Sequence, residues 1–147
     1  MDVVAADTQV LMSEHLRIRR EVFIDEQQVT EDEELDGLDE LDSTLCLVGR
    51  IDGQVVAAAR LVDMDTDHVH VTRVAVERSR RGQGLGAEMM TGAEAMALSR
   101  TTGPLWLVLD AQEHAQGFYE ALGYRRTEKE RFLEARMWHV EMTKRAR

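Results

Sequence analysis

The stretch "RVAVERSRRGQGLGAEMM", Arg73 to Met90, decides the fold. Alternating apolar residues at its start predict a strand, and the apolar stripe that follows Gly84 predicts an amphipathic helix. Between them lie Gly82, Gly84 and Gly86, which are not spaced like ordinary turn glycines. A strand that runs through a glycine turn into a helix leaves unpaired backbone N–H groups at the helix start, where the helix dipole favours an anion.

The glycine stretch predicts a site for a phosphorylated ligand. Glycine lets the backbone approach phosphate oxygens without an intervening Cβ. Arg78, Arg80 and Arg81 add positive charge in a chain whose net charge is -10. The spacing fits neither the dinucleotide fingerprint nor the Walker loop. The alternative interpretation is a flexible loop with solvated arginines.

The flanking sequence predicts a mixed sheet with helices on both faces. Asp52-Gly53 lies between two apolar runs, "STLCLVGRI" and "QVVAAARLV", and indicates a tight hairpin. Met12, Leu16 and Phe23 predict the buried face of a first helix over about Gln9–Gln27. The other expected elements are strands at His68–Val76, 105–110, Tyr124–Glu128 and Met137–Thr143, a helix from Gly84 to near Arg100, and a short helix at Glu113–Leu122 that ends at Gly123. The acidic run Thr30–Asp42 is expected to be an exposed loop or a short helical turn.

Length and composition fit a single domain over residues 1–147. Hydrophobic residues make up 44% and charged residues 31%, as in ordinary globular proteins. No apolar run approaches the ~20 residues of a membrane span, and the N-terminus lacks the layout of a signal peptide. We therefore expect a cytoplasmic protein without a membrane partner. Cys46 is the only cysteine, which excludes a disulfide framework and a cysteine-rich metal site, so no metal is expected. The acidic balance disfavours a nucleic-acid partner and leaves room for a cationic substrate.

The stretch "RVAVERSRRGQGLG" resembles motif A of the GNAT superfamily of acyl-CoA-dependent N-acyltransferases. Its signature, Gln/Arg-x-x-Gly-x-Gly/Ala, matches Arg81 to Gly86. The later stretch "DAQEHAQGFYEALGY" is similar to motif B of the same superfamily, and "LRIRREVFIDEQ" with "LVGRIDGQVVAAARL" is similar to its ElaA-like branch. The resemblance covers about Leu16 to Met142. It implies an α/β (α+β) fold with a mixed, mostly antiparallel central sheet flanked by helices on both faces.

The resemblance also implies acetyl-CoA as co-substrate. Amides around Arg81–Ala87 would hold its diphosphate, and the pantetheine arm would pair with a bulged strand at Val74–Val76. Gln112 and Phe118 would lie beside the pantetheine; a solvated position at a helix start is the alternative for Gln112. The cofactor-binding residues implied in this way are Val74, Ala75, Val76, Arg81, Gly82, Gln83, Gly84, Leu85, Gly86, Ala87, Gln112, Phe118 and Tyr119. The side chains of Val74, Ala75 and Val76 also fit an ordinary strand core.

The implied reaction is direct transfer of an acetyl or other short acyl group to a primary amine in a ternary complex. The N–H of Val74 would stabilise the thioester oxygen, and Tyr119 would protonate the departing thiolate, because thiol and phenol pKa values lie near 8.5 and 10. Tyr119 also fits a plain apolar stripe. Candidate bases for the amine are His70, Glu26 and His139. Cys46 fits a buried, inert position in a strand better than a nucleophile.

The acceptor is expected to be a small-molecule or peptide amine, and a cationic one suits the acidic chain. The run Glu31–Asp42 could attract such a cation or could be a solvated face. ElaA-like relatives tend to read Glu-x-Gly-Ile-x-His, whereas this chain keeps Glu134 and His139 but has Arg136-Met137 between them, so the shape of the acceptor pocket is left open. Exposed strand edges in this fold often pair into homodimers, but the sequence does not determine the oligomeric state. A non-catalytic acyl-CoA sensor of the same fold is the alternative function.

Overall fold

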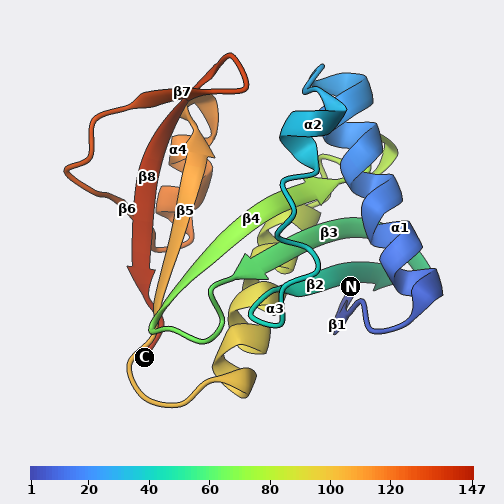
Figure 1. Cartoon of the computed structure of the whole chain (residues 1–147), viewed down its shortest axis with the longest axis horizontal. Helices are drawn as coiled ribbons and strands as arrows, with labels where there is room; N and C mark the ends of the chain where they lie inside the picture. Colours follow the sequence, from blue (N-terminus) through green and yellow to red (C-terminus); the bar gives the residue numbers. More distant parts are fainter.

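One eight-stranded sheet organises the molecule, and the computed structural model describes all 147 residues. Its order is β1-β2-β3-β4-β5-β8-β6, with β7 paired to β8 (Figure 1). Only β4 and β5 run parallel; the other pairs are antiparallel. The mixed, mostly antiparallel sheet predicted from the sequence is confirmed. The strands are β1 (Asp2–Ala5), β2 (Leu45–Ile51), β3 (Gln54–Val62), β4 (His68–Val76), β5 (Trp106–Gln112), β6 (Arg125–Arg126), β7 (Phe132–Glu134) and β8 (Met137–Arg145).

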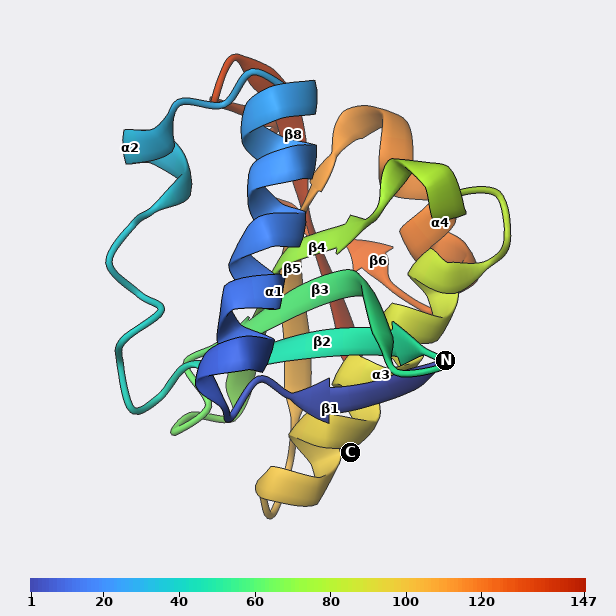
Figure 2. The same ribbon diagram turned by 90° about the vertical axis from the view of Figure 1, so that its right-hand side faces the viewer.

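Helices cover both faces of the sheet, as expected. In Figure 1, α1 (Gln9–Arg19) lies in front of the sheet and α3 (Leu85–Arg100) crosses behind it; Figure 2 shows the same arrangement from the side. An apolar core lies between the sheet and each of these helices. The core under α3 is the larger and the core under α1 the smaller. The remaining helical segments are η1 (Arg20–Glu26), α2 (Glu31–Glu34), η2 (Arg78–Arg80), η3 (Glu113–Ala115) and α4 (Gln116–Ala121). None of the helices is both long and apolar enough to span a bilayer.

The first helix begins where predicted, but its predicted buried face is wrong. Leu16 is exposed, and the buried residues are instead His15, Ile18, Arg19 and Val22. Two of these are polar and are buried because ion pairs and hydrogen bonds satisfy them, which apolar periodicity does not register. The helix also changes type, since Arg20–Glu26 forms a π-helix, in which each hydrogen bond spans five residues in place of four.

The predicted hairpin at Asp52-Gly53 is confirmed. Both residues have positive φ angles, 51° and 79°, and they join β2 to β3. Two short strands, β1 and β7, were not predicted, because runs of four and three residues carry too little alternation.

The sheet splits between β4 and β5. These strands pair only from His68 to His70, opposite Trp106 to Val108, and then diverge into a fork (Figure 1). On its other side, β4 carries a bulge, since β3 pairs with Thr72 and Ala75 but leaves Arg73 and Val74 without partners. Arg73 takes the left-handed conformation, with φ 54°.

Candidate active site

A cavity of about 490 Å³ fills the fork between β4 and β5. The bulge of β4 forms one wall and β5 with β8 forms the other, while η1, α2 and the β7–β8 turn contribute to its rim. The lining residues are Phe23, Gln27, Val29, Glu33, Glu34, Val71, Thr72, Arg73, Val74, Leu109, Asp110, Gln112, Ala115, Tyr119, Glu134, Ala135, Met137 and His139. The cavity therefore brings together the predicted residues Val74, Tyr119, Gln112 and His139.

The glycine loop presents a row of unpaired backbone donors. No N–H group from Gly82 to Ala87 donates a hydrogen bond within the chain; the first intrahelical bond of α3 comes from the N–H of Glu88. Gly82 and Gly84 have φ angles of 80° and 77°, and open space lies where a Cβ would stand at each. Six successive free amides at a helix start form a cradle for an anion.

The arginines beside this loop differ in their pairing. Arg78 and Arg80 have no ion-pair partner. Arg81 instead donates to the carboxylate of Glu26, at 2.9 Å for Nη2 to Oε1, and to the carbonyl oxygen of Val76, at 3.1 Å. Arg78 and Arg80 are thus the cations free to face an anion at the loop.

The bulge at Val74 is held by two ion pairs of the preceding residue, Arg73. The Arg73 guanidinium contacts Glu34 at 3.1 Å and Asp36 at 3.2 Å. Val74 itself has no register partner on β3 or β5. Ala75 is buried under α1, whereas Val76 pairs with Ala57.

Tyr119 lies on the opposite side of the cavity with an unpartnered hydroxyl. Its ring packs edge-on against Phe118 and Tyr124, at centroid distances of 5.0 and 6.0 Å, and no hydrogen bond involves its oxygen. Burial raises the pKa of Tyr119 to about 12, so the phenol stays protonated at neutral pH. The Phe118 ring also lies against Gly86, 3.3 Å from where a Cβ would stand, so α4 contacts the start of α3.

His139 reaches the cavity from β8 with one ring nitrogen free. The residue is 8% exposed, and Nδ1 lies 2.9 Å from the carbonyl oxygen of Met137. A carbonyl can only accept, so Nδ1 carries the proton and the lone pair of the neutral ring is on Nε2. No hydrogen bond engages Nε2. His139 stands opposite Gln112, whose amide donates to Gln27 at 3.0 Å.

Two predicted base candidates lie outside the cavity. His70 belongs to the part of β4 that still pairs with β5, and its Nδ1 lies 3.1 Å from Asp63. Glu26 is paired with Arg81, whose hydrogen bonds lower the pKa of that carboxyl and weaken it as a base.

The acidic run is a solvated face only in part, since Glu31, Asp32, Glu40 and Asp42 are exposed but three other carboxylates pair with arginines. Glu34 is 3% exposed and pairs with Arg19 and Arg73. Asp36 and Asp39 likewise pair with buried Arg60, at 2.8 and 2.9 Å. Glu34, Asp36 and Asp39 thus neutralise the buried arginines Arg19 and Arg60.

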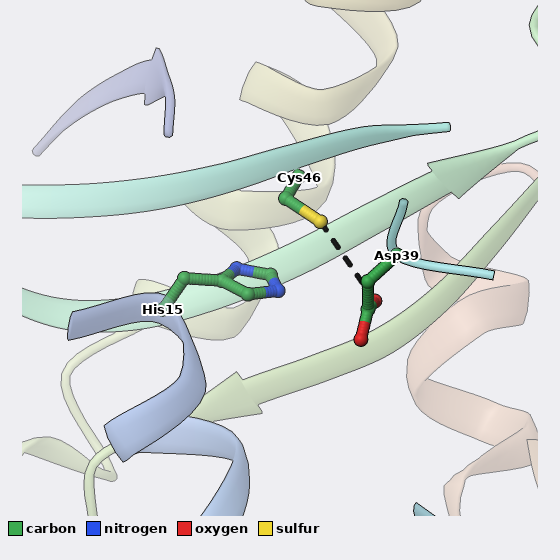
Figure 3. Close-up of side chains that lie close together, drawn as sticks. All are labelled: His15, Asp39 and Cys46. Atoms are coloured by element: carbon green, nitrogen blue, oxygen red, sulfur yellow. Dashed lines mark hydrogen bonds between the residues drawn. The ribbon is translucent and has the colours of Figure 1, made fainter. Parts of the chain in front are cut away.

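One further cluster contains groups that can ligate metals: His15, Asp39 and Cys46 (Figure 3). The atoms that could bind a metal already have partners within the protein. Nδ1 of His15 donates to the carbonyl oxygen of Leu47, and its Nε2 accepts from the guanidinium of Arg19. Arg19 also donates to the carboxylate of Asp39 at 2.7 Å. The guanidinium of Arg19 therefore takes the place that a cation would need. Burial raises the pKa of the Cys46 thiol to about 11, as expected for an inert position.

Sequence reasoning missed one carboxylate of the cavity wall, Asp110, and named the other, Glu134, only as part of the ElaA-like pattern. Asp110 is the only charged residue of β5, "WLVLDAQ". A single charge within an apolar strand was the feature of the sequence that could have marked it as a site residue. Glu134 belongs to the unpredicted β7.

Comparisons with known proteins agree with this geometry. The family described as acetyltransferase (GNAT) domain matches residues 8–146. An uncharacterized N-acetyltransferase of Bacillus subtilis, YjcF, is 30% identical over 98% of this chain and 99% of its own length. An acyl-CoA N-acyltransferase structure from Pseudomonas aeruginosa has a TM-score of 0.85 and 31% identity, covering 98% of this chain and 99% of that one. Escherichia coli ElaA has a TM-score of 0.83 and 24% identity, covering 97% of both chains.

Proposed function

Because this chain belongs to the GNAT acetyltransferase family and is an acyltransferase enzyme, we propose that it moves an acetyl or other short acyl group from acyl-CoA to a primary amine by direct attack in a ternary complex. The observation that carries this proposal is the fork. Val74, without a strand partner, and Tyr119, without a hydroxyl partner, both line one cavity.

Acyl-CoA binding is proposed at the glycine loop. The free amides of Gly82–Ala87 would hold the diphosphate, with Arg78 and Arg80 adding positive charge. The unpaired edge of β4 would then bind the pantetheine arm as a strand would, which directs the thioester into the fork. Gly86 allows the close contact with Phe118 that brings α4, and hence Tyr119, to this end of the fork.

The chemical step begins with attack of the amine nitrogen on the thioester carbonyl carbon. The N–H of Val74 would donate to the oxygen as it becomes negative; removing one such donor elsewhere costs roughly 3–4 kcal/mol. The C–S bond then breaks and the sulfur takes a proton donated by Tyr119. The attacking nitrogen releases one proton to solvent as it becomes an amide, and a proton from solvent restores the Tyr119 phenol. Burial raises the phenol pKa, but the thiolate leaves into the same buried surroundings, which raise the pKa of the thiol as well.

The amine must lose its proton before it attacks. At pH 7 this costs about 4–5 kcal/mol for an amine of pKa ~10.4. His139 is the proposed base, because its Nε2 is unpartnered and the residue lines the cavity. Buried Cys46 is not proposed as a covalent intermediate.

Release of free thiol from acetyl-CoA, measured with and without a panel of primary amines, tests the proposal. Amine-dependent release with formation of the N-acetyl product supports it. Tight CoA binding without release by any amine would contradict it and would favour the non-catalytic sensor. Pairing of two copies and a cytoplasmic location stay predictions.

A further inference from the structure

Two carboxylates in the cavity wall lack a counter-charge. Glu33 and Glu34 also line the cavity, but Glu33 is paired with Arg136 and Glu34 with Arg19 and Arg73. Asp110 on β5 and Glu134 on β7 have no ion-pair or hydrogen-bond partner. The cavity therefore has negative charge that the chain itself does not neutralise.

The groups around Asp110 do not neutralise its negative charge. Glu134 and Glu141 face it with like charge, and His139 lies diagonally across β5 and β8 on the same side of the sheet. Lys129 is the nearby cation, but its Nζ lies over the Phe132 ring at 4.4 Å and pairs with neither carboxylate. Asp110 is exposed toward the cavity; partial burial of its carboxyl and then the negative charge of Glu134 raise its pKa.

A second observation marks the same wall as a ligand site. His139 is more than nine-tenths buried, stacks on Phe132 at a centroid distance of 5.8 Å, and keeps its Nε2 without a partner. Because His139 lines the cavity and no group of the chain bonds its Nε2, this nitrogen is free for a group that arrives with the substrate.

Resting on the proposed function, we propose that the acceptor is a small aliphatic diamine or polyamine: one nitrogen reacts beside His139, while a second ammonium binds Asp110 and Glu134. The reacting nitrogen must be neutral when it attacks, so it cannot supply a lasting charge to both carboxylates. A second ammonium keeps its charge throughout the reaction. Phe23, Val29 and Met137 provide apolar surface for the methylene chain between the two nitrogens.

The discriminating experiment compares 1,4-diaminobutane with butylamine, which has the same chain length and one charge fewer. We expect kcat/KM for the diamine to exceed that for butylamine by at least about 10-fold, the range of one hydrogen bond to a charged group. Asp110→Asn and Glu134→Gln should each reduce that preference to near unity by raising KM for the diamine. The matched control is Glu128→Gln, an exposed carboxylate outside the cavity, which should keep the preference.

Calorimetric titration of 1,4-diaminobutane into the CoA complex measures binding of the diamine without turnover. Binding that Asp110→Asn abolishes supports the inference even if no amine releases thiol, in which case only the proposed function fails. Thiol release with equal kcat/KM for butylamine and diaminobutane would leave the function standing and overturn the inference. A lysine-containing peptide that is acetylated far better than the diamine would overturn it as well.

Discussion

The guanidinium of Arg73 lies 3.1 Å from the carboxylate of Glu34, Nε to Oε1, across 39 positions of sequence. This pair ties the bulge of β4 to the acidic segment that precedes β2. Because Val74 is the next residue, the contact fixes the backbone conformation on which the proposed oxyanion donor depends.

Glu34→Gln should therefore destabilise the fold. The carboxylate is 3% exposed and serves two arginines, so its loss leaves buried positive charge and should lower the free energy of unfolding by about 3 kcal/mol. Urea denaturation measures this. The matched control is Glu31→Gln, which breaks an exposed pair with Arg20 and should cost less than about 1 kcal/mol. Equal losses in the two variants would show that the network does not hold the bulge.

Tyr119→Phe should lower kcat about 100-fold and leave the CoA dissociation constant within about 2-fold. The hydroxyl has no partner in the protein, so its removal should affect only the departing sulfur. Steady-state kinetics and CoA titration separate the two effects. Tyr124→Phe is the control, because Tyr124 is the only other tyrosine and does not line the cavity. Unchanged kcat in Tyr119→Phe would assign the proton to water or another group.

His139→Gln should lower kcat/KM about 100-fold at pH 7, and the deficit should shrink toward pH 10. At high pH the amine is already neutral and needs no base. Activity profiles of both proteins from pH 7 to 10 test this, with exposed His68→Gln as the control. A deficit that stays constant with pH would mean that His139 shapes the pocket and takes no proton.

Protein stability should fall as the pH is lowered from 6.5 to 4. Burial lowers the pKa of His15 from 6.5 to about 4, so within this window the unfolded chain binds a proton that the folded chain does not. Folding free energy is lost in proportion, by up to about 3 kcal/mol. His15→Gln should be less stable at pH 7 but lack this share of the pH dependence. Parallel stability curves for the two proteins would contradict the assignment.

Much of the fold could be predicted because it depends on local signals. Asp52-Gly53 fixes a hairpin through its own backbone angles, and the glycines before α3 mark the helix start. The family and the acyltransferase class are also confirmed. The buried face of α1 could not be found in this way, because Arg19 is buried by partners distant in sequence.

The candidate site was predicted unevenly for the same reason. Val74, Tyr119 and His139 follow from motifs and do line the cavity. His70 does not line the cavity and Asp110, which was not predicted, does. Both placements depend on where β4 separates from β5, and neither strand's sequence alone determines that point.

The most direct test of the account is the CoA affinity of Gly84→Val measured against that of Gly103→Val. Both glycines have a φ angle of 77° and open space at the Cβ position, so both variants introduce the same backbone strain, but only Gly84 belongs to the free-amide loop. We predict that Gly84→Val raises the CoA dissociation constant more than about 30-fold, through lost hydrogen bonds to a charged group, and that Gly103→Val changes it less than about 2-fold. Equal CoA affinity in two folded variants would contradict diphosphate binding at this loop.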